Sequence, residues 1–178
     1  MKLLLATGNA HKARELSAML GGVGLELKTL ADFPDVPAVV EDGRTLIENA
    51  VKKAVEPAML TGLWTLADDT GLEVEALGGR PGVYSARYAG PECDFAANCR
   101  KVLSELEGLP GPKRTAVFRT VVALASPDGR VQVREGRLEG RIASHPVGKN
   151  GFGYDPVFLL PEEGRTLAQL SDEEKNAL

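Results

Sequence analysis

The sequence predicts a mixed α/β fold in a single domain, residues 1–178, on three observations. An apolar run at the amino terminus changes at once into a helical pattern, and two long β-rich runs later in the chain form a hairpin. Strands and helices neither alternate strictly nor separate into blocks, which favours a mixed sheet with flanking helices. At 178 residues the chain can bury roughly two-thirds of its unfolded surface in one core.

The amino-terminal segment predicts a strand, a polar turn and a helix. The apolar run Leu3 to Leu5 breaks into the turn 6–9, and a helical stripe then continues to a stop at Gly21-Gly22. A second strand is expected over 25–30. The strand-turn-helix junction directs backbone N–H groups and the positive end of a helix dipole at one spot, which suits a phosphate. The alternative is that Asn9 only caps the helix and Lys12 is solvated.

The next part of the chain predicts a capped helix and a buried strand before an acidic pair. Thr45-Leu46-Ile47-Glu48 is a capping-box pattern that opens a helix toward residue 60, with Pro57 as a kink or an early end. The stretch 64–67 predicts a strand that ends at Asp68-Asp69. Neighbouring residues on an extended backbone point to opposite sides, so we expect only one aspartate to face a ligand. The alternative is a turn in which both bond to local amides.

The second half of the chain predicts one helix, a hairpin and a glycine-rich loop. The helix fits residues 94–106, and the runs 117–125 and 131–142 are joined by Ser126-Pro127-Asp128-Gly129, a turn with Pro second and Gly fourth. The glycine-rich loop 148–155 leads into a short strand at 157–160. Ser171-Asp172-Glu173-Glu174 is a second capping box and begins a last helix.

Composition limits the classes of function. The net charge of −4 argues against a general nucleic-acid surface, although a local cationic pocket is still possible. Cys93 and Cys99 do not form a C-x-x-C motif, so we expect two free thiols in a reducing cytoplasm. The amino-terminal apolar run is too short for a signal peptide, and no run is long enough to span a membrane.

Several polar and aromatic residues are candidates for chemistry. Glu41 and one of the two aspartates could hold Mg²⁺, which needs only one or two protein carboxylates when substrate phosphates complete its shell. Lys53 shares a predicted helix face with Thr45 and Asn49, a pattern typical of either a pocket or a solvated surface. The loop from Phe152 to Asp155 could stack on a planar base and read its edge, or Phe152 and Tyr154 could pack into a core.

Five blocks, in order along the chain, together resemble one family. They are T-G-N-A-H-K at 7–12, E-N-A-V-K-K-A at 48–54, A-D-D-T-G-L at 67–72, P-G-V-Y-S-A-R-Y-A-G at 81–90 and F-G-Y-D-P at 152–156. The sequence is similar to the Ham1-like inosine/xanthosine triphosphate pyrophosphatases. The resemblance implies an α/β fold with a long hairpin and a substrate cleft between two lobes. It also implies a Mg²⁺-dependent, homodimeric hydrolase that converts non-standard purine nucleoside triphosphates (ITP, dITP, XTP) to the monophosphate and pyrophosphate.

The resemblance also implies roles for particular residues. Asp69 is expected to be the proton acceptor, and Glu41 and Asp69 the metal ligands. The expected substrate contacts are Thr7, Gly8, Asn9, Ala10, His11, Lys12, Lys53, Thr70, Phe152, Gly153, Tyr154, Asp155 and Lys175. The first six of these and Lys53 would hold the phosphates, Thr70 would contact substrate, and the last five would line the base pocket.

The sequence departs from the family pattern at two points. Thr70 stands where serine is commoner, and its hydroxyl keeps the same donor and acceptor. The family continues beyond the segment 174–176 into a base-selecting His-Arg pair, and we expect a tail with this pair beyond Leu178 rather than an altered selectivity. A nucleotide-binding regulatory module without turnover is the alternative function, because every block could bind a triphosphate without cleaving it.

Overall fold

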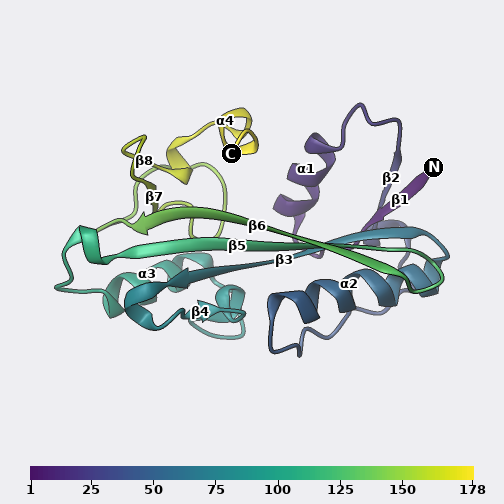
Figure 1. Ribbon diagram of the computed structural model, residues 1–178, viewed down its shortest axis with the longest axis horizontal. Helices are drawn as coiled ribbons and strands as arrows, with labels where there is room; N and C mark the ends of the chain where they lie inside the picture. Colours follow the sequence, from purple (N-terminus) through teal and green to yellow (C-terminus); the bar gives the residue numbers. More distant parts are fainter. The chain divides into compact units, whose positions relative to one another are not determined.

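The computed structural model describes residues 1–178 and has the predicted mixed α/β fold (Figure 1). Its strands are hydrogen-bonded in the order β2-β1-β3-β5-β6-β7-β8, with β4 paired to β3. The chain forms two compact units. Unit 1 comprises Met1–Asp69 and Thr120–Gly136, and unit 2 comprises Thr70–Arg119 and Arg137–Leu178. No helix is both long and apolar enough to cross a membrane.

The regular structure comprises eight strands, four α-helices and five short 3-10 helices. The strands are β1 (Lys2–Leu5), β2 (Glu26–Thr29), β3 (Trp64–Val74), β4 (Pro81–Gly82), β5 (Thr115–Ala125), β6 (Val131–Ile142), β7 (Phe158–Leu160) and β8 (Arg165–Thr166). The helices are α1 (Ala10–Met19), α2 (Leu46–Thr61), α3 (Phe95–Glu105) and α4 (Asp172–Asn176).

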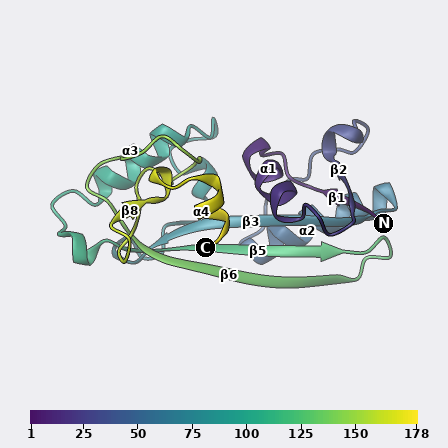
Figure 2. The ribbon, with the colours of Figure 1, turned by 90° about the horizontal axis from the view of Figure 1, so that it is seen from above.

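In unit 1, β1 is the middle strand of a parallel group. Leu3 is in register with Leu27 of β2 on one side and with Trp64 of β3 on the other. A strand paired on both edges and covered by helices is buried on both faces, which explains why β1 is a continuous apolar run. Accordingly, Leu4 and Leu5 are fully buried. Helix α1 follows β1 directly and lies beside β1 and β2 (Figure 2).

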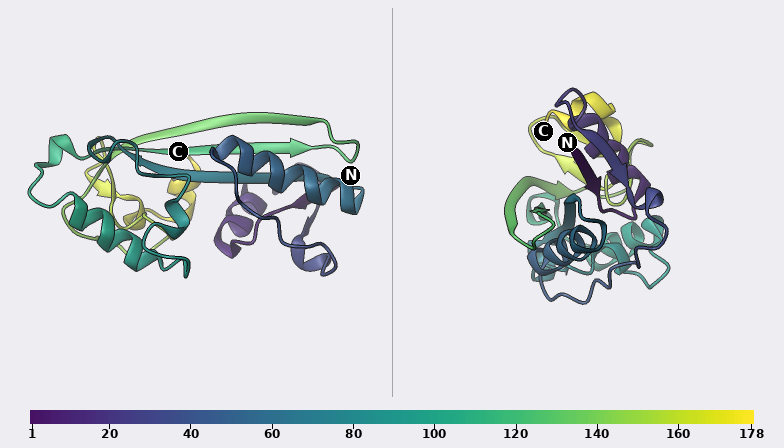
Figure 3. Two further views of the ribbon diagram at one scale, coloured as in Figure 1. Left: turned by 90° about the horizontal axis from the view of Figure 1, so that it is seen from below. Right: turned by 90° about the vertical axis from the view of Figure 1, so that its right-hand side faces the viewer.

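Helix α2 begins at the predicted capping residue and runs past the proline inside it. The hydroxyl of Thr45 accepts a hydrogen bond from the Glu48 N–H at 3.1 Å. The early end considered at Pro57 is wrong, because the helix continues to Thr61. Its small residues Ala50, Ala54 and Ala58 are completely buried, and burial of this face outweighs the one backbone bond that a proline cannot donate. Figure 3 shows α2 running alongside β3.

Strand β3 differs from its predicted length. Pairing with β1 ends at Leu66, whose carbonyl accepts from the Ala6 N–H at 2.8 Å, but the strand itself continues to Val74. The acidic pair therefore lies inside a strand, and the prediction that the strand ends before it is wrong. The strand continues because antiparallel pairing with β4 and burial of Leu72 hold its second half, although glycine and aspartate are weak strand formers.

The hairpin of β5 and β6 is confirmed. The Gly129 N–H donates to the Ser126 carbonyl at 2.9 Å, and Gly129 has a positive φ of 85°, which a glycine adopts without strain. In Figure 1 the long strands β3, β5 and β6 lie side by side.

Unit 2 has its own hydrophobic core, with Phe158 of β7 among its fully buried residues. Gly140 of β6 lies against this ring, since a Cβ there would be 2.5 Å from a Phe158 carbon atom. Arg114 is also buried. Its guanidinium donates to the carbonyls of Leu106, Leu109 and Ala143 at 2.9 to 3.0 Å, so it joins the end of α3 to the segment after β6.

Candidate functional site

The turn between β1 and α1 is ordered by its own side chains. Thr7 Oγ1 accepts from the Asn9 N–H at 3.2 Å, and Asn9 Oδ1 accepts from the His11 N–H at 2.9 Å. Asn9 is therefore the N-cap of α1, as one of the two interpretations expects. A side chain at Gly8 would meet no atom of the chain within 4 Å, so this side of the turn is open. The helix N-terminus behind it favours an anion.

The remaining residues of this block differ in where they point. Ala10 begins α1 and offers only its backbone. The imidazole Nδ1 of His11 lies 2.9 Å from a guanidinium nitrogen of Arg14 at the protein surface. Lys12 extends to β3, where its Nζ lies 2.5 Å from Asp68 Oδ2. The turn and the first of the two aspartates are thus directly connected within unit 1.

Two lysines from two helices bind the two aspartates. Asp68 binds Lys12 of α1, and Asp69 Oδ1 accepts from Lys53 Nζ of α2 at 2.9 Å. Both aspartates are buried, at 6% and 8% exposure. Because neighbours on a strand face opposite ways, each carboxylate receives its own cation. The sequence did not predict the Lys12–Asp68 pair, because its two residues are 56 positions apart.

Glu41 joins the second of these pairs. Its Oε2 lies 3.1 Å from Lys53 Nζ, so one ammonium binds both Glu41 and Asp69. Burial raises the pKa of the Asp69 carboxyl above its usual range, while the Lys53 ammonium opposes this effect. Burial also disfavours the charge on Lys53, but attraction to Asp69 and Glu41 is stronger and raises its pKa. Lys53 is therefore a permanent cation at neutral pH.

The arrangement of Glu41 and Asp69 fits a sparsely held divalent cation. No group of three or more His, Cys, Asp or Glu side chains is placed to hold a metal ion. Two carboxylates that already share one cationic group are nevertheless close enough to share another. One or two carboxylates are the usual protein contribution when substrate phosphates and water supply the other ligands of Mg²⁺. The donor set therefore fits Mg²⁺ with a phosphate ligand.

Asn49 is part of this cluster although the sequence indicated only a shared helix face. It is 1% exposed, its Nδ2 donates to Asp69 Oδ2 at 3.3 Å, and its Oδ1 accepts from the Gly43 N–H at 2.8 Å. Its spacing of four from Lys53 was the available signal. Spacing alone could not show that its partners lie on β3 and on the loop before α2.

Unit 2 contains a second cluster of predicted site residues. Asp155 Oδ2 accepts from Lys175 Nζ at 2.8 Å and from the Phe152 N–H at 2.9 Å. The same ammonium lies 4.7 Å from the centre of the Phe152 ring. The centroids of the Phe152 and Phe95 rings are 6.1 Å apart. The carboxylate is 6% exposed and the lysine 17%. An aromatic face, a cation and a carboxylate are therefore held together.

Three other predicted contacts lie in less accessible places. Tyr154 is 4% exposed, and its hydroxyl donates to the Ser85 carbonyl at 2.8 Å, so its side chain belongs to the core of unit 2. The carbonyl of Gly153 accepts from the Cys99 thiol at 3.3 Å. Thr70 is a half-buried residue of β3, next to Asp69 in the chain. Any contact of Tyr154 with a ligand would have to come from its backbone.

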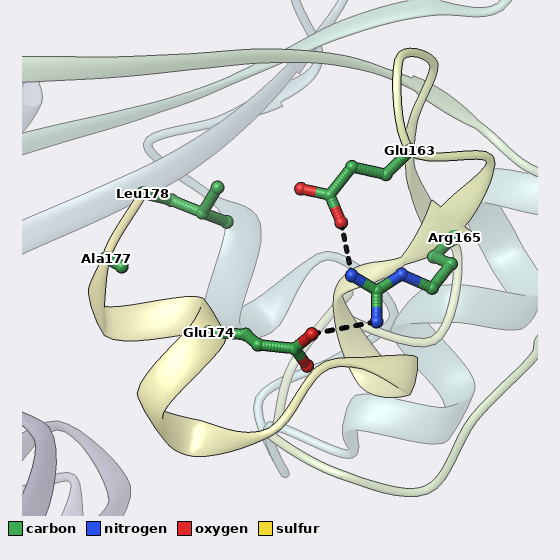
Figure 4. A pocket seen from close by; sticks show the side chains of 5 residues that line it. All are labelled: Glu163, Arg165, Glu174, Ala177 and Leu178. Atoms are coloured by element: carbon green, nitrogen blue, oxygen red, sulfur yellow. Dashed lines mark hydrogen bonds and ion pairs between the residues drawn. The ribbon is translucent and has the colours of Figure 1, made fainter.

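A hollow of about 510 Å³ lies near the carboxyl-terminal helix of unit 2 (Figure 4). Arg165 binds Glu163 at 2.6 Å and Glu174 of α4 at 3.0 Å, and Ala177 and Leu178 complete the lining. None of the predicted site residues lines it. The guanidinium of Arg165 is already bound by two carboxylates. This favours a structural role for Arg165 in fixing α4, the helix that carries Lys175.

The sequence matches a known protein family along almost its whole length. The Ham1 family model matches residues 3–178. This chain belongs to the Ham1 family. The dITP/XTP pyrophosphatase of Geobacter sulfurreducens is 52% identical over 177 residues, which cover 99% of this chain and 89% of the relative. The dITP/XTP pyrophosphatase of Geobacillus kaustophilus is 50% identical over 99% of this chain and 87% of its own length.

Solved structures of Ham1 proteins have the same fold. The HAM1 protein from Coxiella burnetii matches with a TM-score of 0.90 at 41% identity, over 99% of this chain and 90% of that one. The nucleoside-triphosphatase / dITP/XTP pyrophosphatase from Mycobacterium abscessus matches with a TM-score of 0.81 at 46% identity, over 99% of this chain and 93% of that one. The family resemblance and the mixed α/β fold predicted from the sequence are both confirmed.

Proposed function

We propose that this Ham1 chain hydrolyses the non-standard purine nucleoside triphosphates dITP, XTP and ITP to the monophosphate and pyrophosphate. The observation that carries the proposal is the convergence of Glu41, Lys53 and Asp69, in which one partly buried ammonium binds two carboxylates. The names of relatives with 50% identity or more support the choice of substrate. A binding module without turnover is not favoured, because these relatives are pyrophosphatases.

The phosphate chain would be held by cations and backbone donors of unit 1. The N-terminus of α1 and the open side of Gly8 suit a phosphate oxygen, and Lys12 and Lys53 supply positive charge. Thr7, Asn9, Ala10 and His11 would shape this turn and donate from it. Neutralising the charge that develops on the leaving pyrophosphate is the largest contribution expected from such a site.

Asp69 would accept the proton of the attacking water. The water oxygen bonds to the α-phosphorus, the bond from that phosphorus to the bridging oxygen breaks, and pyrophosphate leaves. The raised pKa of Asp69 makes it a stronger proton acceptor than an exposed aspartate. Mg²⁺, held by Glu41 and Asp69, would neutralise phosphate charge and increase the acidity of the water.

The base would be recognised by the cluster in unit 2. Phe152 offers a face for stacking, and the buried Lys175–Asp155 pair offers a donor and an acceptor. Gly153 and the backbone at Tyr154 would complete the base contacts, and Thr70, which follows Asp69 in the chain, would contact the substrate. A site built to bond a 6-oxo group leaves polar atoms unmatched when adenine binds, and this asymmetry gives strong discrimination.

The proposal extends to the domain organisation, the cellular compartment, the cofactor and the assembly of the enzyme. The match of one family model to residues 3–178 supports one pyrophosphatase domain over 1–178. The two free cysteines support a reducing cytoplasm. The proposal also includes Mg²⁺ as the cofactor and a homodimer as the assembly. Analytical ultracentrifugation would test the homodimer.

The experiment is pyrophosphate release from a panel of dITP, XTP, ITP, dATP and dGTP with Mg²⁺. Turnover of the first three and little of the others is expected. Asp69→Asn should abolish release while equilibrium dialysis still detects nucleotide binding. Absence of release from the whole panel would favour the binding module, and near-normal turnover by Asp69→Asn would remove Asp69 from its role as the base.

A further inference from the structure

The loop before α2 is tied to that helix at four consecutive residues. As the loop advances by one residue, its partner lies earlier in the helix. The pairs are Glu41 with Lys53 at 3.1 Å, Asp42 with Lys52 at 2.7 Å, the Gly43 N–H with Asn49 at 2.8 Å and the Arg44 N–H with Glu48 at 2.6 Å. The loop therefore runs antiparallel to the first turns of α2, and its position fixes where the Glu41 carboxylate stands.

These four ties differ in strength because they differ in burial. The side chains of Asp42 and Lys52 are 68% and 32% exposed, and exposed ion pairs contribute little. Glu48 is exposed too. Asn49 is 1% exposed, and a buried polar group that loses its partner is costly. Of the ties made by residues 42–44, the bond to Asn49 therefore holds the loop most firmly.

Asn49 also reaches the other carboxylate of the cluster. Its Oδ1 must face the Gly43 N–H, which can only donate, so its Nδ2 faces Asp69 Oδ2 at 3.3 Å. Asp69 Oδ1 is bound by Lys53. One buried amide therefore connects the loop that carries Glu41 to the carboxylate of Asp69.

The close approach of the loop to Asn49 requires a glycine. A Cβ at Gly43 would lie 2.5 Å from Asn49 Oδ1 and 2.9 Å from Glu48 Cβ. The φ of Gly43 is not in the left-handed region, so an alanine there is opposed by contact alone. Gly43→Ala would displace the amide of Asn49 without altering residue 49 itself.

We propose that Asn49 is a positioning residue that sets the placement of Glu41 relative to Asp69, and through it the affinity of this pair for a divalent cation. The inference rests on the proposed function, in which these two carboxylates hold Mg²⁺. Asn49 acts through its neighbours, because its two polar atoms are already bonded to Gly43 and Asp69. Groups that orient metal ligands typically change metal affinity or activity by 10–100-fold when they are replaced.

The test compares two variants with two matched controls. Asn49→Leu removes both hydrogen bonds at similar volume, and Gly43→Ala displaces the amide. Asn98→Leu is the control for loss of a buried amide, since Asn98 is also 1% exposed and also ties a helix to a loop, by bonds to Ala86 and Ala89. Gly136→Ala is the glycine control, because a Cβ there meets nothing within 4 Å.

Binding of Mn²⁺ alone, followed by the electron paramagnetic resonance of the free ion, is the first measurement. Both variants should bind Mn²⁺ about 10-fold more weakly than wild type, and both controls should bind it normally. The second measurement is the Mg²⁺ concentration for half-maximal pyrophosphate release, which should rise by a similar factor while kcat at saturating Mg²⁺ changes less. Circular dichroism establishes that each protein is folded.

Wild-type Mn²⁺ affinity in Gly43→Ala, or equal weakening in Asn98→Leu, would overturn the proposal. Gly43→Ala decides the matter even if Asn49→Leu does not fold. Failure of the proposed function can be told apart from failure of this inference. The proposed function fails if wild-type protein releases no pyrophosphate, whereas the role of Asn49 is decided by Mn²⁺ binding.

Discussion

Replacing Lys175 by methionine should destabilise the protein by leaving a buried carboxylate without its cation. Lys175 Nζ lies 2.8 Å from Asp155 Oδ2 and 4.7 Å from the centre of the Phe152 ring. The aspartate side chain is only 6% exposed, so it cannot be rescued by water. Methionine keeps the length and most of the apolar contact of lysine, and the change removes mainly the charge.

The magnitude follows from the burial of the two partners. Removing one member of a fully buried pair costs about 3–5 kcal/mol. Here the lysine is 17% exposed and the Phe152 N–H still donates to the carboxylate, so we expect a loss of about 2 kcal/mol. For a chain of 178 residues this corresponds to a fall in Tm of roughly 4–8 °C.

Thermal unfolding at pH 7, followed by circular dichroism, measures this loss. Lys113→Met is the matched control, since Lys113 is exposed, and it should change Tm by less than about 1 °C. The double variant Lys175→Met with Asp155→Asn should recover more than half of the loss, because asparagine keeps an oxygen for the Phe152 N–H and carries no charge. A further fall in the double variant would refute the explanation by an unpaired buried charge.

Three further predictions follow from other buried or half-buried groups. Burial raises the pKa of the Cys99 thiol to about 11. A thiol reagent at pH 8 should therefore modify exposed Cys93 at once and Cys99 only after denaturant is added. Rapid reaction of both thiols in the folded protein would contradict this. Burial and the bond to Glu105 raise the pKa of Tyr88 to about 12, so the folded state keeps a proton that the unfolded chain loses near about pH 10. Its stabilising contribution is complete below about pH 10 and is lost as the pH approaches 12, and urea unfolding should show the difference between wild type and Tyr88→Phe shrinking over that range. Arg114→Met should cost about 3 kcal/mol in urea unfolding, because three carbonyls lose a charged donor, and a loss below about 1 kcal/mol would show that water replaces the guanidinium.

Elements with local signals could be predicted from the sequence. The caps at Thr45 and Ser171 are confirmed by hydrogen bonds from N–H groups three residues later, at 3.1 and 3.2 Å. The helix begun at Asp94 is confirmed in the same way, at 3.0 Å. These interactions lie within four residues of one another, so residue type and spacing determine them.

Features that depend on distant partners could not be predicted. The length of β3 depends on pairing with β4, which holds Leu72 against Gly82. The partner of Lys12 is Asp68, far along the chain, and residue types alone do not identify such a pair. Asn49 looked like one member of a helix face, and only the fold places it between a loop and a strand.

The aromatic loop settles one of its two residues: Tyr154 packs into the core, while a contact of Phe152 with a ligand stays a prediction. The sequence left open whether Phe152 and Tyr154 contact a ligand or pack into a core. The Tyr154 side chain is in the core of unit 2, where its hydroxyl bonds to Ser85, while Phe152 lies beside Lys175. Two residues of the same chemical type differ because the loop between them turns at Gly153, which has a positive φ of 60°.

The most direct test of the account is the position of oxygen from solvent in the products. Turnover of dITP in water enriched in oxygen-18, followed by mass spectrometry, shows which phosphorus is attacked. Attack on the α-phosphorus, with Asp69 accepting the proton, predicts one labelled oxygen in dIMP and none in pyrophosphate. Label in pyrophosphate, or release of inorganic phosphate in its place, would contradict the proposed pyrophosphatase chemistry.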